Sequence, residues 1–559
     1  MEQLLNDGWQ FCKLPLGSTL EDVSNAALQA VDLPHDFLIE NENDLYETTD
    51  AWYLRTLDVP ESWCASCVLV RFDGVYMDCD VLLNGHIVCT HHYGYTAFDV
   101  DLTSRLLVGR NTLAVHIRHQ SPNSRWYSGA GIYRDVTLHV LPKRHIPLDG
   151  VYVTTTHELE SWTMTIDTEL CGVKDNGVLT HVLLDGDVPV CDVTVEAAGD
   201  HANAVMQVLS PKLWSPDAPN VYTLQTMLGN QVIRQNVGFR DLTFTTDCGL
   251  LVNGAPVKLH GVCLHHDLGC LGSAFHEKAM RRQLRAMRQM GVNALRTSHN
   301  PPAKQVMDLC DELGIFVVDE AFDMWLRAKT PFDYARFFPT DMPSDVAAWV
   351  RRDRNHPSLL MWSIGNEILD THLDESAQQV TCDLCENVRL HDPRGNAVIT
   401  IGSNFMPWEG ARKCADLVDA QGYNYGEKYY EAHHAEHPDW VFYGSETASA
   451  LSSRGIYHFP MAASILSDED LQCSALGNST SSWGTKDMRK CIVEDLNTPY
   501  SLGQFLWSGI DYIGEPTPYH TRSCYFGMMD TAVFPKDYWY LFKSLWTNAP
   551  MVHLSLIHI

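Results

Sequence analysis

Two glutamates that close short apolar segments are the strongest candidates for chemistry in this sequence. Glu367 ends the segment MWSIGNE at 361–367, and Glu446 ends WVFYGSE at 440–446. Apolar segments of this length, bounded by turn residues, are typical of buried strands, so each carboxyl group is expected at a strand end. A single glutamate at such a place is more often a cap or a salt-bridge partner, and it is the pair that points to catalysis.

A pair of carboxyl groups can cleave a glycosidic bond. One carboxylic acid protonates the leaving oxygen, and one carboxylate attacks or stabilises the oxocarbenium-like carbon. Carboxyl groups held close together differ in their affinity for protons, so the two can take different roles. The pair therefore predicts a glycosidase, and a retaining mechanism would require the two carboxyl groups to lie about 5 to 5.5 Å apart.

Strands that alternate with helices must position these glutamates. After Gly249, apolar segments of strand length alternate with segments of helical period, for example the expected helix 276–290. The eight expected strands cover 256–266, 294–299, 315–322, 359–367, 397–401, 419–425, 440–446 and 502–512. Eight such units predict a (β/α)8 TIM barrel, in which catalytic groups lie at the C-terminal ends of strands.

Two β-rich regions precede the barrel. Residues 1–142 contain strand-length segments separated by Asp-Gly and Asn-Gly turns, which predict a β-sandwich. Residues 143–247 show strands without helical periodicity and suit an immunoglobulin-like β-sandwich. The barrel is expected over 248–553, and residues 554–559 continue no earlier pattern, so we interpret them as a non-native tail.

Composition excludes several classes of partner. The chain of 559 residues carries a formal net charge of −30, which argues against nucleic acid and anionic membranes. It has no apolar run of about 18 residues and no N-terminal signal, so a cytoplasmic location is expected. The 17 cysteines include two Cys-x-x-Cys pairs, Cys64 with Cys67 and Cys382 with Cys385. We interpret the cysteines as reduced, buried thiols rather than as a zinc site.

Several segments together resemble glycoside hydrolase family 2. SIGNE at 363–367 resembles the acid/base segment of that family, and GSETAS at 444–449 resembles the nucleophile segment of its β-galactosidase branch. Four further segments are similar to family segments at barrel strand ends: GVCLHHD at 261–267, RTSHNPP at 296–302, VDEA at 318–321 and GQFLW at 503–507. The resemblance covers nearly all of residues 1–550 and implies a jelly-roll sandwich, an immunoglobulin-like sandwich and a catalytic barrel, in that order.

The resemblance also implies roles for individual residues. Glu367 matches the acid/base, which must be protonated when the leaving oxygen departs and ionised when it activates water. Glu446 matches the nucleophile and is expected to stay charged. The other matching residues are Asn366 for the sugar 2-hydroxyl, Tyr425 (alternatively Tyr423) as a donor to the nucleophile, His265 and His299 around the sugar hydroxyls, and Trp507 as the floor of the pocket. Taken alone, each aromatic or histidine side chain could equally serve in packing.

Departures from the family pattern carry information about metal and substrate. Met324 and Leu326 stand where related β-galactosidases supply magnesium ligands, so we expect no catalytic metal and no cofactor. Arg125 replaces an aspartate that, in the family, reaches the sugar from the jelly-roll loop, and it could favour an acidic or extended sugar. Against this, segment 524–526 (CYF) lacks the Asn-x-Lys by which β-glucuronidases of the family hold a uronate.

A retaining exo-β-glycosidase, and within that class a β-galactosidase, is therefore the expected function. A β-glucuronidase or β-galacturonidase is the first alternative, and a non-catalytic carbohydrate-binding protein is the second. The expected partner is a carbohydrate, and the resemblance implies dimers or larger homo-oligomers. Because family members commonly carry further β-domains, we interpret the chain as a metagenomic fragment cut just after Trp546.

Overall fold

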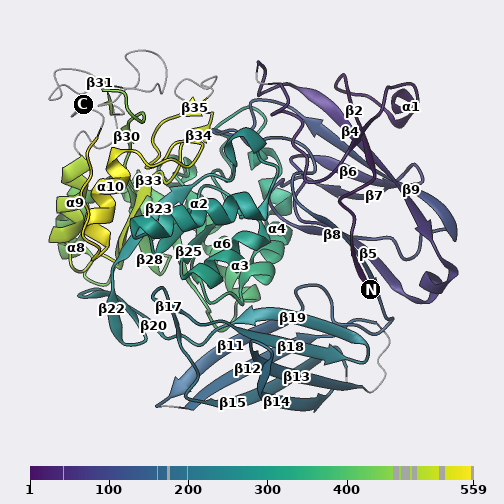
Figure 1. The fold of residues 1–559 in the computed structure, drawn as a ribbon, viewed down its shortest axis with the longest axis horizontal. Helices are drawn as coiled ribbons and strands as arrows, with labels where there is room; N and C mark the ends of the chain where they lie inside the picture. The colour runs from purple at the N-terminus through teal and green to yellow at the C-terminus, as the bar shows by residue number, and fades with distance from the viewer. Residues whose placement is uncertain are drawn as a thin grey trace.

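The computed structural model describes the chain except residues 42, 160, 173–176, 198, 458–464, 467–478, 481–487, 515–522 and 556–559. Most of the predicted non-native tail therefore lies outside the described residues. In Figure 1 the first sandwich lies beside the barrel and the second sandwich lies below it. No helix in the described part is long and apolar enough to cross a membrane.

The first sandwich consists of two antiparallel sheets. Their strand orders are β1-β10-β5-β8 and β3-β2-β4-β9-β6-β7. The strands are β1 (Glu2–Leu4), β2 (Trp9–Leu14), β3 (Gln29–Val31), β4 (Thr49–Val59), β5 (Cys67–Phe72), β6 (Cys79–Leu83), β7 (His86–His91), β8 (Phe98–Asp101), β9 (Gly109–His119) and β10 (Val136–Leu141), with α1 (Leu20–Val23) between β2 and β3. In β5 every second residue is buried, as expected for a strand with one face on the core. The predicted sandwich is confirmed.

The second sandwich pairs the sheets β11-β12-β15 and β14-β13-β18-β19. Its strands are β11 (Val151–Glu158), β12 (Ser161–Glu169), β13 (Val178–Asp185), β14 (Val188–Glu196), β15 (His201–Leu209), β18 (Tyr222–Leu228) and β19 (Gln231–Val237). Alternate residues of β15 are buried and exposed along its whole length. Two small strands, β16 (Trp214–Ser215) and β17 (Ala218–Pro219), pair with each other between β15 and β18. The small strands β20 (Leu242–Thr245), β21 (Gly249–Val252) and β22 (Ala255–Val257) follow β19 and lead to the barrel.

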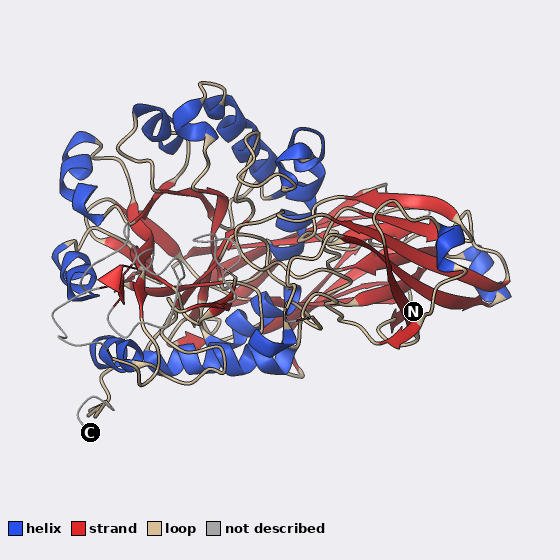
Figure 2. Ribbon diagram, turned by 90° about the horizontal axis from the view of Figure 1, so that it is seen from above, coloured by secondary structure: helices blue, strands red, loops and turns tan. Residues whose placement is uncertain are grey.

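Eight parallel strands close into a barrel, as predicted. They are β23 (Leu259–Leu264), β24 (Ala294–Thr297), β25 (Phe316–Glu320), β26 (Leu359–Asn366), β27 (Val398–Ser403), β28 (Ala420–Asn424), β29 (Phe442–Ala448) and β33 (Gly503–Trp507). Figure 2 shows helices around the outside of the ring of strands. All eight residues of β26 are buried, because a barrel strand packs on both faces, and this explains why the strands appear in the sequence as apolar runs.

Nine helices are described around the barrel, and two of them end at a glycine. They are α2 (Glu277–Met290), α3 (Lys304–Leu313), α4 (Phe338–Asp353), α5 (Asp370–Leu373), α6 (Ala377–His391), α7 (Glu409–Ala415), α8 (Tyr430–Glu436), α9 (Met488–Asn497) and α10 (Asp537–Trp546). Gly291 and Gly314 follow α2 and α3 with φ of 100° and 68°, the left-handed conformation that ends helices and favours glycine.

Two expected elements differ from the structure. The first predicted strand divides into β22 and β23, and the eighth ends at Trp507, after which β34 (Tyr512–Ile513) pairs with β35 (Ser523–Cys524) instead of with the barrel. Three further short strands, β30 (Ala450–Leu451), β31 (Ile465–Leu466) and β32 (Ser479–Thr480), form a small sheet after β29. These short segments resemble their neighbours in composition, so apolar pattern alone does not separate them.

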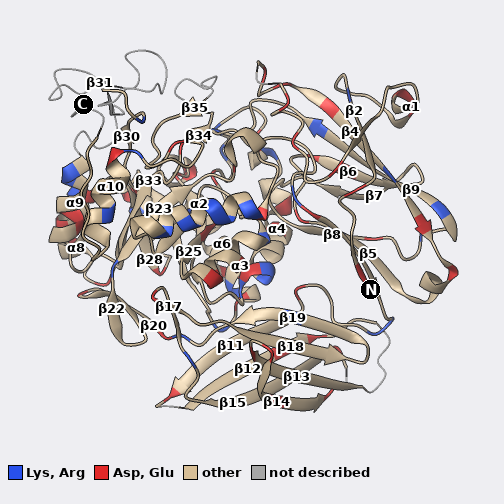
Figure 3. Cartoon of the chain, viewed as in Figure 1, with Lys and Arg blue, Asp and Glu red and all other residues tan. Residues whose placement is uncertain are grey.

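Charged side chains are mixed by sign over the face seen in Figure 3, and Lys and Arg are dense along α2. Three of the four arginines of α2 bond within the chain: Arg281 pairs with Glu277 and Glu312, and Arg282 and Arg288 donate to backbone carbonyls. This surface therefore gives no support for a nucleic-acid site. The 16 cysteines in the described part are free; contrary to the expectation of burial, Cys64 and three others are exposed.

The second sandwich is joined to the barrel through Asp392, which follows α6. Its carboxylate accepts hydrogen bonds from Tyr152 Oη (2.7 Å), Trp362 Nε1 (3.1 Å) and the backbone N–H of Asn396 (3.0 Å). Asp392 is 2% exposed. Buried donors that lose a charged acceptor keep their full desolvation cost.

We expect Asp392→Ala to lower the free energy of unfolding of the barrel by about 2 to 4 kcal/mol, because the buried donors of Tyr152 and Trp362 lose their acceptor. Urea unfolding followed by tryptophan fluorescence measures the change. Glu386→Ala, at an exposed position of α6, is the matched control and should change it by less than about 0.5 kcal/mol. Equal losses in the two variants would contradict this role for Asp392.

Candidate active site

A cavity of about 510 Å³ opens at the C-terminal ends of the barrel strands and is partly covered by the loop between β9 and β10. Seven of the eight predicted site residues line it: Arg125, His265, His299, Glu367, Tyr425, Glu446 and Trp507. The remaining lining residues are Trp126, Ser403, Asn404, Met406, Pro407, Tyr423, Asn424, Gly426, Lys428, Tyr429 and Tyr512. The two glutamates therefore share one cavity rather than facing different compartments.

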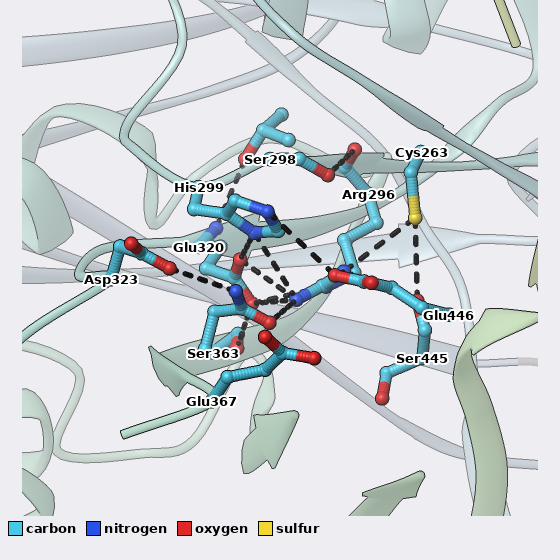
Figure 4. A network of polar contacts seen from close by, with 12 residues as sticks. Cys263, Arg296, Ser298, His299, Glu320, Asp323, Ser363, Glu367, Ser445 and Glu446 are labelled. Carbon is cyan, nitrogen blue, oxygen red and sulfur yellow. Dashed lines mark hydrogen bonds and ion pairs between the residues drawn. The ribbon is translucent and has the colours of Figure 1, made fainter. Parts of the chain in front are cut away.

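Arg296, at the end of β24, connects the polar groups beneath this cavity. Its NH1 donates to Glu446 Oε1 at 2.9 Å, its Nε to Glu320 Oε2 at 3.0 Å and its NH2 to Asn366 Oδ1 at 2.8 Å. The guanidinium is fully buried (Figure 4). One rigid, planar cation thus fixes side chains from β25, β26 and β29, a task that suits the fork geometry of arginine.

Glu446 is held between this cation and a tyrosine hydroxyl. Burial raises the pKa of Glu446 to about 7, while Arg296 and a hydrogen bond from Tyr425 act in the opposite direction. This differs from the expectation of a carboxylate that stays charged. The physical reason is that Glu446 is 4% exposed and shares its nearest cation with Glu320.

Tyr425, and not Tyr423, is the tyrosine that meets the nucleophile candidate. The side chain of Tyr425 is hydrogen-bonded to Glu446, and its backbone N–H donates to the Glu446 carbonyl at 2.8 Å. Tyr423 Oη instead contacts His433 Nδ1 at 2.8 Å. Tyr425 has a φ of 53°, so the chain turns sharply after β28 and directs the two neighbouring tyrosines to different partners.

Glu367 lies between the first sandwich and β28. Its carboxylate accepts from Arg125 NH1 at 3.2 Å and from Asn424 Nδ2 at 3.1 Å. Arg125 also forms two hydrogen bonds with Asp323, at 2.9 and 2.6 Å. Lys329 Nζ donates to Asp323 at 2.9 Å, and with Arg125 it lowers the pKa of Asp323 to about 2. Glu367 therefore faces a cation that the N-terminal domain supplies and that Asp323 holds in place.

Asn366 is the one predicted site residue that does not line the cavity. It is fully buried, its Oδ1 accepts from Arg296 and from Asn424 Nδ2 (3.0 Å), and its Nδ2 donates to Asp323 at 2.8 Å. The amide thus links the group around Glu446 to the group around Glu367. A contact between Asn366 and a sugar hydroxyl stays a prediction.

Aromatic rings and histidines form another part of the cavity lining, and His299 Nε2 lies 3.7 Å from Glu446 Oε1. The ring of His299 stacks on Trp507 with centroids 5.3 Å apart, and His265 stacks on Trp126 at 5.1 Å. Burial lowers the pKa of His265 to about 3 and that of His299 well below its usual value. Neutral imidazoles can exchange hydrogen bonds with hydroxyl groups, and flat rings can cover the apolar face of a sugar.

Sequence reasoning gave no role to several residues that build this site. Arg296 and Glu320 stand inside segments that were singled out, so their position was signalled although their function was not. Asp323, Lys329 and Asn424 were missed. An apolar stretch that ends in a polar residue was the available signal for Asn424, whereas Asp323 and Lys329 lie in a loop without pattern.

No part of the cavity lining combines acidic or histidine side chains in the manner of a built cation site, as far as the described residues extend. Met324 is buried and Leu326 is 41% exposed, and neither lines the cavity. One group elsewhere has metal-ligand chemistry, Asp308, Asp311 and His356. Asp311 there accepts from His356 Nδ1 at 2.6 Å and from the N–H of Ser358 at 2.9 Å, which explains the cluster as structural. The absence of a catalytic metal stays a prediction.

Comparison with known proteins defines the class. Residues 3–142, 145–240 and 245–429 match the models of the sugar-binding domain, of a second domain and of the TIM barrel domain of glycosyl hydrolases family 2. The chain is 35% identical to beta-galactosidase BoGH2A of Bacteroides ovatus, over 94% of this chain and 69% of that protein. With this support, the chain belongs to glycosyl hydrolase family 2 and is a glycoside hydrolase.

Some relatives are named for a different substrate. The chain is 29% identical to a putative beta-glucuronidase of Formosa agariphila, over 99% of this chain and 56% of that protein. A crystal structure of a beta-glycosidase from Bacteroides vulgatus superposes with a TM-score of 0.87 at 29% identity, over 99% of this chain and 76% of that one. The family is therefore shared, while the sugar differs among relatives.

We expect the pH dependence of kcat/KM to show an acidic limb near pH 7. Glu446 must be ionised to attack, and because its pKa is raised to about 7, activity falls as the pH drops through that value. Steady-state rates on an aryl glycoside across the pH range measure the limb. A limb near the ordinary glutamate pKa of about 4.3 would contradict this effect of burial.

Tyr425→Phe should move that acidic limb to higher pH and lower kcat/KM by about 10- to 100-fold, because the hydroxyl stabilises ionised Glu446. Tyr423→Phe is the matched control, since Tyr423 bonds to His433 instead, and should leave the limb unchanged. A limb that moves equally in both variants would count against a specific contact with Glu446.

Proposed function

We propose that this protein is a retaining exo-β-glycosidase, and specifically a β-galactosidase that removes terminal non-reducing β-D-galactose. The observation that carries the proposal is the pair Glu367 and Glu446 in one cavity, tied together through Arg296, Asn366 and Asn424. The similarity to a protein named as a beta-galactosidase supports the choice of sugar.

The reaction proceeds by double displacement. A carboxylate oxygen of Glu446 attacks the anomeric carbon while Glu367 gives its proton to the leaving oxygen, so the glycosidic bond breaks and a glycosyl-Glu446 ester forms. Glu367, now ionised, then takes a proton from water, whose oxygen attacks the same carbon and releases Glu446. Tyr425 and Arg296 hold Glu446 in place for both steps.

A β-glucuronidase or β-galacturonidase is the second candidate, favoured by the name of the Formosa relative. Such an enzyme would need a cation to bind the carboxylate of the uronate. Arg125 is the cation nearest to Glu367, but its guanidinium is paired with both Asp323 and Glu367. In segment 524–526, which lacks the Asn-x-Lys, Cys524 and Phe526 are fully buried. The geometry therefore favours a neutral sugar.

We expect hydrolysis of nitrophenyl β-galactoside and little of the matching glucuronide, with Glu446→Gln lowering kcat by roughly 10⁴-fold or more. Labelling with a 2-fluoro galactoside and mass spectrometry should place the sugar on the peptide that contains Glu446. Glu367→Gln separates the roles: it should spare substrates with good leaving groups far more than Glu446→Gln does. Hydrolysis of the uronide alone would defeat the galactosidase assignment, and full turnover by Glu446→Gln would defeat the assignment of Glu446 as the nucleophile.

A further inference from the structure

The side of the cavity next to Glu367 is built by the loops that follow β27 and β28. Ser403 ends β27, Asn404, Met406 and Pro407 come from the loop that follows it, and η4 (Glu427–Tyr429) carries Lys428 and Tyr429 in the second loop. We call these six lining residues the β27–β28 wall. It stands apart from the histidine and tryptophan side chains that follow β23, β24 and β33.

The position of Glu367 relates this wall to one part of the substrate. The acid/base must face the leaving oxygen, so the leaving group lies on the Glu367 side of the scissile bond. Strand β27 pairs with β26, and the backbone N–H of Glu367 donates to the carbonyl of Gly402 at 2.8 Å, which places the loop after β27 beside Glu367. The loop after β28 lies next to it, between β27 and β29, and Asn424 at the end of β28 donates to Glu367 at 3.1 Å. The stacked rings of His299 and Trp507 line the part of the cavity that is left for the transferred sugar.

The β27–β28 wall is held rigidly. Arg412 NH1 donates to the carbonyl oxygens of Met406 at 3.1 Å and Pro407 at 3.0 Å, which fixes the first loop. In the second loop, the ring of Tyr429 stacks on His433 with centroids 5.5 Å apart and planes 13° from parallel. The wall therefore offers a preformed surface with apolar and aromatic character.

Lys428 is the unbalanced charge of the cavity. The charged residues that line it are Arg125, Glu367, Glu446 and Lys428. Arg125 is paired with Asp323 and Glu367. Lys428 is exposed, and within the described part of the chain no carboxylate lies within ion-pair distance of it; its ammonium lies 5.0 Å from the centroid of the Tyr429 ring. The negative net charge of the whole protein acts weakly here, because charges beyond about 8 Å are screened at physiological salt.

We propose that the β27–β28 wall is a leaving-group subsite that selects acidic leaving groups, with Lys428 as the residue that receives the negative charge and Tyr429, Met406 and Pro407 as the surface that contacts its body. The proposal rests on the proposed role of Glu367 as acid/base. It concerns the leaving group only and is independent of which sugar is transferred.

The test compares 4-carboxyphenyl glycoside with its methyl ester, using whichever sugar the enzyme hydrolyses. The ratio of their kcat/KM values should fall about two- to fivefold in Lys428→Met, through KM of the carboxylate substrate, and should be retained in Lys428→Arg. In the wild type the ratio should shrink as salt rises from about 0.01 M to about 1 M. Because each ratio is taken within one enzyme, differences in leaving-group reactivity cancel between variants.

Lys278→Met is the matched control, since Lys278 is an exposed lysine on α2, outside the cavity. It should leave the ratio unchanged. An unchanged ratio in Lys428→Met, or an equal fall in Lys278→Met, would overturn the proposal while leaving the proposed glycosidase function intact. Absence of hydrolysis with every sugar, in contrast, would defeat the proposed function itself.

Discussion

The active site depends on a buried guanidinium. Arg296 reaches Glu320, Asn366 and Glu446 from the end of β24, so a single side chain fixes groups at the ends of three other strands. Buried carboxylates are tolerated only when they are paired and hydrogen-bonded, and removing a partner typically costs about 3 to 5 kcal/mol. The barrel therefore needs Arg296 for its own stability as well as for the geometry of the nucleophile.

The N-terminal sandwich supplies part of the same site. Arg125 crosses from the loop between β9 and β10 to Asp323 and Glu367 in the barrel, and Tyr93 and Arg134 donate to the barrel carbonyls of Ala321 and Pro301. These contacts fix the angle at which the loop covers the cavity. The N-terminal sandwich is therefore part of the site, because it completes the surroundings of the acid/base candidate.

The sequence could predict the features that a local pattern of residues encodes, namely the strands and the residues at their ends. Barrel strands buried on both faces appear as apolar runs, and the glutamates at their ends could be found from those runs and their flanking residues. Ion pairs between loops leave no such trace: Arg125 and Asp323 are 198 positions apart, and nothing near either residue signals the other. The charge state of Glu446 was missed for a related reason, since its burial and the sharing of Arg296 are set by packing.

The two glutamates are related by the net charges of the groups around them as well as by their positions in one cavity. Arg296 with ionised Glu320 and Glu446 leaves one net negative charge in a fully buried group, whereas Arg125 and Lys329 with Asp323 and ionised Glu367 are neutral. A single proton therefore neutralises the whole network. Asn366 and Asn424 bridge the two groups, so a sugar bound between the carboxyls meets one hydrogen-bonded network rather than two independent acids.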